Sequence, residues 1–263
     1  MARPCIALLT DFGTQDHYAG TMKGVAIGIC PDAALIDLTH EIPPHDVTAG
    51  AIELAASYRY FPAGTIFLVV VDPGVGSSRR GLAAEASGYR FIAPDNGVLT
   101  LVFRDGAPRR VVELTERKYA RPTVSRTFEG RDRFAPAAAW LAKGVDLSAL
   151  GRPVTAWQTL SLPEPIVSAS QIAGEVWRVD RFGNLITNIE RATLARLAPD
   201  RPLSITVGGH AVDALVTTYA EAAKDALCAL FGSSDHLEVA VNGGSAADRL
   251  GIGRGAPVAI TRE

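Results

Sequence analysis

The chain has 263 residues, of which 48% are hydrophobic and 21% are charged, and its formal net charge at neutral pH is −2. This composition is that of a globular protein with enough apolar residues for a core. Without a basic surplus, the charge argues against nucleic acid or a membrane surface as a partner. No apolar stretch approaches the roughly 20 residues of a membrane span.

The N-terminal residues and the cysteines both indicate a cytoplasmic protein. The apolar run that precedes Asp11 is too short for the apolar region of a signal peptide plus a cleavage site. Cys5, Cys30 and Cys228 are scattered without CxxC spacing. We expect them to be buried, reduced thiols.

Strands and helices alternate through the first half of the chain. Short apolar or β-branched runs predict strands at 6–9, 35–38, 65–71, 90–93 and 111–114. Helical periodicity predicts helices at 18–30, 47–58 and 134–141, the second of them with Asp46 as its N-cap. This alternation predicts an α/β fold, with a mostly parallel, Rossmann-like domain over residues 1–155.

The pattern changes near residue 150. Pro163 and Pro165 punctuate a stretch without periodicity, which predicts a linker over 156–170. Beyond it, short apolar runs predict strands at 175–179, 185–189, 203–207, 211–216, 227–231, 237–241 and 258–261. Gly208-Gly209 predicts a hairpin turn. We expect residues 171–263 to form a small antiparallel β-barrel domain.

Two of the predicted strands end in a carboxylate followed by glycine. Asp11 precedes Phe12-Gly13, and Asp72 precedes Pro73-Gly74. In open α/β sheets, ligands bind outside the carboxyl ends of the strands, so both carboxylates occupy positions where a substrate would lie. The alternative is that each aspartate only caps the following turn or helix, and position alone does not decide between the two.

Three further segments carry charged or aromatic groups that could serve a site. Arg79 and Arg80 follow Asp72 by seven and eight residues, and a guanidinium there could hold a carboxylate. Residues 127–134 place four charges between aromatics before a helix. Residues 180–184 combine a carboxylate, an aromatic and an amide between two strands. Solvated turns and a capped helix start are the alternative interpretations.

A metal site is a further alternative. The residues that could serve as metal ligands within the first fifty are Asp11, Asp16, His17, Asp37, His40, His45 and Asp46. A metal-dependent phosphoesterase or nucleoside hydrolase could use such a set. None of the histidines forms an HxxxH or HxH pair, so ordinary loop positions explain them as well.

Eight motifs in order resemble one family. They are LLTDFG, MKG, THEIPPHDVTAGA, VVDPGVGSSRR, PDNG, TFEGRDRFAPAAA, DRFGNLITN and EVAVNGGSAA. In this order they are similar to the S-adenosylmethionine hydroxide adenosyltransferases, relatives of fluorinase and chlorinase. The resemblance implies a homotrimer that holds its substrate between the N-terminal domain of one subunit and the C-terminal domain of its neighbour. It also implies hydrolysis of S-adenosyl-L-methionine to adenosine and L-methionine without a metal or other cofactor.

The resemblance also implies roles for individual residues. Asp72, Arg79 and Glu129 occupy the positions of the catalytic set around the attacking water. The expected substrate-binding residues, with Asp11 on the ribose hydroxyls, are Asp11, His45, Phe128, Asp180, Phe182, Asn184, Tyr219, Ser234, Glu238 and Val241.

This chain departs from the family at Glu129, where the family's TFHGRD motif has histidine. A carboxylate there could accept a proton from water, orient Arg79, or raise the pKa of Asp72 by like-charge repulsion. Alternatively it weakens hydrolysis or alters the nucleophile. Loss of catalysis through Glu129 would leave a protein that only binds S-adenosylmethionine or adenosine. Gly130 stands where the halogenating relatives carry serine, which argues against a halogenase.

Overall fold

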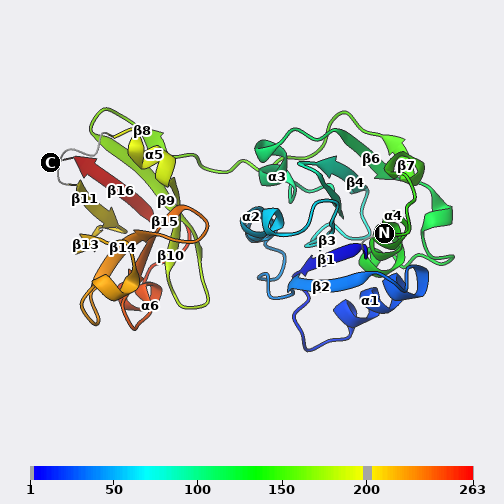
Figure 1. Ribbon diagram of the computed structural model, residues 1–263, viewed down its shortest axis with the longest axis horizontal. Helices are drawn as coiled ribbons and strands as arrows, with labels where there is room; N and C mark the ends of the chain where they lie inside the picture. The colour runs from blue at the N-terminus through cyan, green and yellow to red at the C-terminus, as the bar shows by residue number, and fades with distance from the viewer. Residues whose placement is uncertain (1–2, 198–202, 263) are drawn as a thin grey trace. The chain divides into compact units, whose positions relative to one another are not determined.

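The computed structural model describes residues 3–197 and 203–262, which fold into two compact units, Met1–Leu160 and Ser161–Glu263 (Figure 1). The stretch predicted as a linker divides between them. Gln158 donates its backbone N–H to Asp95 of the first unit (2.8 Å), whereas strand β8 (Ile166–Val167) pairs with a strand of the second. Each unit has its own core and its own sheet.

The first unit is built on a seven-stranded sheet of order β2-β1-β3-β5-β4-β6-β7. Its strands are β1 (Cys5–Thr10), β2 (Ala34–Thr39), β3 (Ile66–Val70), β4 (Gly81–Ala86), β5 (Tyr89–Pro94), β6 (Arg110–Leu114) and β7 (Gly151–Pro153). All five strands predicted in this half are confirmed. Parallel pairing joins β2, β1, β3 and β5, and antiparallel pairing joins β5, β4, β6 and β7. The sheet is therefore mixed, where the sequence predicted a mostly parallel one.

The missed strand β4 explains this difference. Its sequence, GLAAEA, is rich in alanine, which has low strand propensity. It nonetheless pairs with β5 along its whole length through a hairpin whose turn residues, Ser87 and Gly88, both have positive φ (51° and 82°). Tertiary pairing here overrides the local preference of the residues.

Both faces of this sheet are covered by helices, which is why its central strands are apolar throughout. Alternate residues of β1 and β3 belong to two separate core clusters, one on each face. Helices α1 (Tyr18–Ile29) and α4 (Ala135–Ala142) contribute to the first cluster, and α2 (Val47–Ser57) and α3 (Thr100–Asp105) to the second. The predicted cap of α2 is confirmed, because Asp46 accepts a hydrogen bond from the N–H of Ala49 at 2.9 Å.

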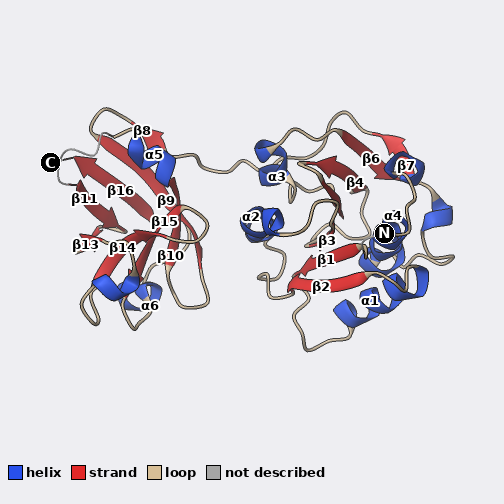
Figure 2. Cartoon of the chain, viewed as in Figure 1, coloured by secondary structure: helices blue, strands red, loops and turns tan. Residues whose placement is uncertain are grey.

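The second unit is mainly strand (Figure 2). Its main sheet has the order β12-β11-β16-β9-β10-β15-β14-β13 with β8 added beside β9, and it curls into a half-barrel. The strands are β9 (Gln171–Val179), β10 (Leu185–Glu190), β11 (Leu203–Val207), β12 (His210–Ala211), β13 (Ala214–Leu215), β14 (Leu227–Phe231), β15 (His236–Val241) and β16 (Pro257–Arg262). Two short helices, α5 (Arg191–Ala195) and α6 (Ala246–Leu250), complete the unit. Closure of this sheet into a barrel stays a prediction.

The hairpin at Gly208-Gly209 is confirmed. The two glycines link β11 to β12 with φ values of 56° and 84°, a conformation that glycine adopts without strain. The single strand predicted over 211–216 is wrong. The chain breaks there into β12, which pairs with β11, and β13, which pairs with β14 in parallel.

Shorter helical turns cover Tyr58–Tyr60, Arg117–Tyr119, Leu147–Leu150 and Tyr219–Glu221, and a π-helical turn covers Gly130–Phe134. Cys30 and Cys228 are buried free thiols, and Cys5 is a partly buried one. Within residues 3–197 and 203–262, no helix has the length and apolar character to cross a bilayer.

Candidate active site

The first unit presents Asp11 and Asp72 at the carboxyl ends of two neighbouring strands. Strands β1 and β3 are adjacent and parallel, with Thr10 opposite Val70. Asp11 follows β1 directly, and Asp72 follows β3 by two residues. This is the edge of an open α/β sheet at which ligands bind.

A buried ion-pair cluster joins Asp72, Arg79 and Glu129. The guanidinium of Arg79 donates from Nε to Asp72 Oδ1 (3.0 Å) and from Nη2 to Asp72 Oδ2 (2.5 Å). The same Nη2 group donates to Glu129 Oε2 at 2.6 Å. The side chains of Asp72, Arg79 and Glu129 are 6%, 8% and 12% exposed, so the pairs are little screened by water. The three residues expected to be catalytic are thus joined through Arg79.

A close backbone approach holds the Asp72 loop against the segment that leads to Glu129. Gly76 has φ of +79°, and a Cβ there would lie 2.4 Å from the carbonyl oxygen of Arg126. Any other residue would therefore push the two segments apart. Gly76 is therefore required by this packing as well as by its positive φ.

The two neighbouring arginines serve different partners. Arg79 faces the cluster, whereas Arg80 donates from Nε (2.8 Å) and Nη2 (2.5 Å) to Asp95 Oδ2 and from Nη2 to the carbonyl of Ala156 (2.8 Å). The sequence left open which of the two arginines faces the site, because they are adjacent in one polar turn. Asp95 belongs to the PDNG segment that precedes α3, and its carboxylate ties Arg80 to the end of the first unit.

Arg133 is a fourth member of the cluster that the sequence reasoning did not assign. Its Nη1 donates to Glu129 Oε1 at 2.8 Å, and its Nη2 donates to the carbonyl of Leu114 at 2.6 Å. Glu129 and Arg133 are four residues apart at the start of a helical segment. The i,i+4 spacing of opposite charges was the signal in the sequence that could have found it.

The surroundings of Asp72 shift its pKa. Burial raises the pKa of the Asp72 carboxyl above its ordinary value, Arg79 opposes this shift, and the negative charge of Glu129 adds to it. A carboxylate with a raised pKa is a stronger base than an exposed aspartate. Asp72 is therefore suited to accept a proton from water that lies next to it.

Asp11 is tied to the His45 loop through the backbone. The N–H of His45, which has a positive φ of 68°, donates to Asp11 Oδ2 at 2.8 Å. A non-glycine residue in this conformation is strained, and such strain is concentrated at functional sites.

Aromatic rings gather next to Asp11. The ring of Phe128 lies edge-on to Phe12 (5.9 Å between centroids) and to Tyr18 (5.2 Å). Phe128 thus links the segment before Glu129 to the loop after β1. These contacts place the predicted residues Asp11, Phe128 and Glu129 around one edge of the first unit.

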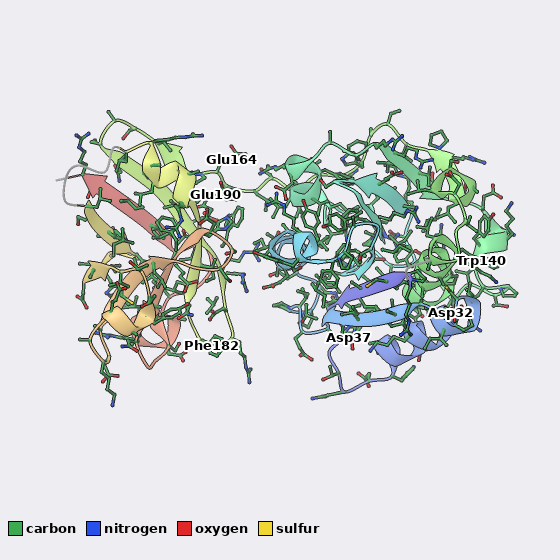
Figure 3. The ribbon with its side chains drawn as sticks, viewed as in Figure 1. Asp32, Asp37, Trp140, Glu164, Phe182 and Glu190 are labelled. Carbon is green, nitrogen blue, oxygen red and sulfur yellow. The ribbon has the colours of Figure 1, made fainter. Side chains whose placement is uncertain are left out.

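Several of the acidic and histidine residues near the N-terminus have partners within the first unit. His40 is buried and bonds Thr10 Oγ1 (2.8 Å) and Asp37 Oδ1 (3.0 Å), and Asp37, on β2 (Figure 3), also pairs with Lys23 (2.5 Å). Asp46 caps α2. Within the described part of the chain, no three histidine, cysteine or acidic side chains are grouped closely enough to hold a metal ion.

The second unit contains a cavity of about 960 Å³. Seven residues expected to bind substrate line it: Asp180, Phe182, Asn184, Tyr219, Ser234, Glu238 and Val241. Phe182, labelled in Figure 3, lies in the turn between β9 and β10 and is 76% exposed. A large ring that exposed, at the rim of a cavity, is available to cover an aromatic ligand.

The cavity wall is shaped by hydrogen bonds within the predicted set. Asp180 accepts from the backbone of Phe182 (2.9 Å) and from the backbone and side-chain amide of Asn184 (2.9 and 3.0 Å), which fixes this turn. Tyr219 donates its hydroxyl to Glu238 Oε1. Burial raises the pKa of Glu238, and the bond from Tyr219 opposes the shift.

Other lining residues were not assigned from the sequence. Polar groups among them come from Arg178, Thr217, Thr218 and the Asn242-Gly243-Gly244 turn. Of these, only the Asn242-Gly243-Gly244 turn could be noticed in the sequence, because it lies in the EVAVNGGSAA motif. The threonines lie in an irregular segment between β13 and β14, and nothing local distinguishes them from other loop residues.

Comparison with known proteins identifies the family. Models of the SAM hydroxide adenosyltransferase N-terminal and C-terminal domains match residues 6–151 and 174–259. Proteins named (R)-S-adenosyl-L-methionine hydrolase from Thermus thermophilus and Salinispora tropica are 38% and 39% identical, over 97% and 98% of this chain and 98% of theirs. More distant relatives are named fluorinase. A crystal structure of a conserved protein from Thermotoga maritima superposes with a TM-score of 0.93 at 36% identity, over 98% of this chain and 100% of that one. The chain belongs to the SAM hydroxide adenosyltransferase family.

Proposed function

We propose that this protein hydrolyses (R)-S-adenosyl-L-methionine to adenosine and L-methionine. Relatives that share 38–39% of their residues over nearly the whole chain carry the name of this activity. The observation that carries the proposal in this chain is the buried contact of Asp72 and Arg79 at the carboxyl edge of the sheet. Since the methionine is already specified as L, the (R) descriptor refers to the sulfonium centre, so we expect the enzyme to distinguish sulfonium epimers.

The reaction needs a positioned and activated water more than it needs help for the leaving group. Water oxygen forms a bond to the ribose 5′ carbon as the bond from that carbon to sulfur breaks, and the electron pair remains on methionine sulfur. The sulfonium loses its charge, so methionine leaves as a neutral thioether without a Lewis acid. One proton leaves the attacking water, and alignment and proton removal are therefore what the protein must supply.

The residues of the first unit supply these functions in our proposal. Asp72 accepts the proton, and Arg79 fixes the Asp72 carboxylate through two hydrogen bonds. Asp11 binds the ribose hydroxyls. His45 and Phe128 contact the same, ribose-containing end of the substrate. The cavity residues of the second unit, with Phe182 at the rim, bind the remaining parts of the substrate.

Chromatography of the reaction products tests the proposal. Purified protein incubated with the (R) epimer in the presence of a metal chelator should release adenosine and L-methionine in equal amounts, and the (S) epimer should react more slowly. Arg110→Met is a control, because Arg110 pairs with Glu85 (2.7 Å) and Asp146 (3.1 Å) away from the cluster. Binding of the substrate without product would reject hydrolysis, and activity that the chelator abolishes would reject metal-free chemistry.

We further propose a homotrimer in the cytoplasm, in which the first unit of one subunit and the second unit of its neighbour share each substrate. Co-expression of Asp72→Ala and Phe182→Ala subunits tests this sharing at substrate concentrations far below the KM of the second variant. A site is intact only when the first unit of a Phe182→Ala subunit meets the second unit of an Asp72→Ala subunit. Random mixing of equal amounts should therefore give about a quarter of the wild-type number of intact sites. Activity no greater than the mean of the two parent variants would contradict shared sites.

A further inference from the structure

We propose that Arg133 is a positioning residue of the active site, which neutralises Glu129 and so keeps Arg79 bound to Asp72. This inference deepens the proposed hydrolysis and rests on it for its kinetic readout. It concerns the one cluster member to which the family resemblance assigns no role.

The charges of the cluster balance only when Arg133 is counted. Asp72 and Glu129 carry two negative charges, and Arg79 alone supplies one positive charge. Both carboxylates are at least 88% buried, and an uncompensated charge in such a place is costly. Arg133, whose side chain is 25% exposed, supplies the second positive charge at 2.8 Å from Glu129.

The hydrogen bonds show why this second charge matters for Arg79. Nη2 of Arg79 donates to both Asp72 Oδ2 (2.5 Å) and Glu129 Oε2 (2.6 Å), so the charge of Glu129 attracts the same guanidinium that Asp72 holds. Arg133 occupies the other oxygen of Glu129. Without Arg133, the full charge of Glu129 would act on Arg79 and draw it away from Asp72.

Arg133 is itself held in place. Its Nη2 donates to the carbonyl of Leu114 at the end of β6, which fixes the guanidinium between the strand and the start of the helical segment. A merely structural role, in which Arg133 only ties these elements together, is the competing explanation. The two differ in whether the effect of Arg133 depends on the charge of Glu129.

A double-mutant cycle between Arg133 and Glu129 distinguishes them. Arg133→Gln removes the charge but keeps a donor for the Leu114 carbonyl, and Arg133→Lys keeps the charge. We expect Arg133→Gln to lower kcat about tenfold with little change in KM, and Arg133→Lys to restore most of the rate. In a Glu129→Gln background, Arg133→Gln should change kcat by less than about twofold. Equal losses in both backgrounds would overturn the inference.

A second readout does not depend on turnover. The titration of the Asp72 carboxyl carbon, followed by carbon-13 NMR, should move to higher pH in Arg133→Gln and should not move in the Arg133→Lys or Arg110→Met controls. An unchanged Asp72 titration in Arg133→Gln overturns the inference, whatever the kinetics. If the wild-type protein forms no adenosine, hydrolysis fails, while this titration still decides the role of Arg133. Circular dichroism checks that each variant is folded, and Arg133→Met replaces the glutamine variant if that one is not.

Discussion

Asp72→Ala is expected to lower kcat by about 10³-fold, the range associated with loss of a general base, and to change KM little. Asp72 is the buried carboxylate beside the expected position of the attacking water, and its removal leaves the expected substrate-binding residues of the second unit unchanged. Phe182→Ala should show the opposite division, with a raised KM and a kcat near that of the wild type, because in our proposal this exposed ring only covers the substrate. Steady-state kinetics on the two variants check this division. If kcat falls and KM rises to the same extent in the two variants, the division is contradicted.

The pH dependence of kcat should report the same carboxyl. Asp72 must be ionised to accept a proton, and burial raises its pKa, with Glu129 acting in the same direction. The rate should therefore fall as the pH drops through a value above the ordinary aspartate range. In Asp72→Asn, whose residual rate has no ionising group at this position, that acidic limb should disappear.

Glu129→His is expected to lower kcat about tenfold, although it restores the residue of the family motif. In this chain the carboxylate of Glu129 lies between two guanidiniums, those of Arg79 and Arg133. A neutral or protonated imidazole there would leave Arg133 without a counter-charge and would release Arg79 from its second partner. Adding Arg133→Gln to this variant should change kcat by less than about twofold, as in the Glu129→Gln background, because Arg133 acts through the charge of Glu129.

A gain in rate for Glu129→His alone would show instead that Glu129 is a defect relative to the family. The measurement is kcat for adenosine formation in the three proteins at one pH near neutrality. Thermal unfolding of each variant serves as the control for stability, because a buried ion pair that loses one partner is destabilising.

The local residue pattern predicted those elements of the fold that are buried along their whole length. The run 65–71 is apolar because β3 is covered on both faces, and Asp46 is recognisable as a cap from its position alone. Strand β4 escaped prediction because its alanines favour helix, and only its pairing with β5 and β6 makes it a strand. Residues 211–216 looked continuous although their partners lie on two different strands.

The candidate site divides in the same way. Asp11 and Asp72 could be found because strand ends are visible in a sequence. The choice of Arg79 over Arg80 could not, because it depends on where Asp95 lies after folding. The family resemblance indicated Glu129, whereas the only sequence signal for Arg133 was its i,i+4 spacing from Glu129, and the folded cluster shows the contact between them.

The most direct test of water attack on the 5′ carbon is the fate of solvent oxygen. Turnover of (R)-S-adenosyl-L-methionine in water enriched with oxygen-18 should place one label in the 5′ hydroxyl of adenosine and none in methionine, as read by mass spectrometry. Unlabelled adenosine, or release of adenine or methylthioadenosine in its place, would contradict the proposed reaction.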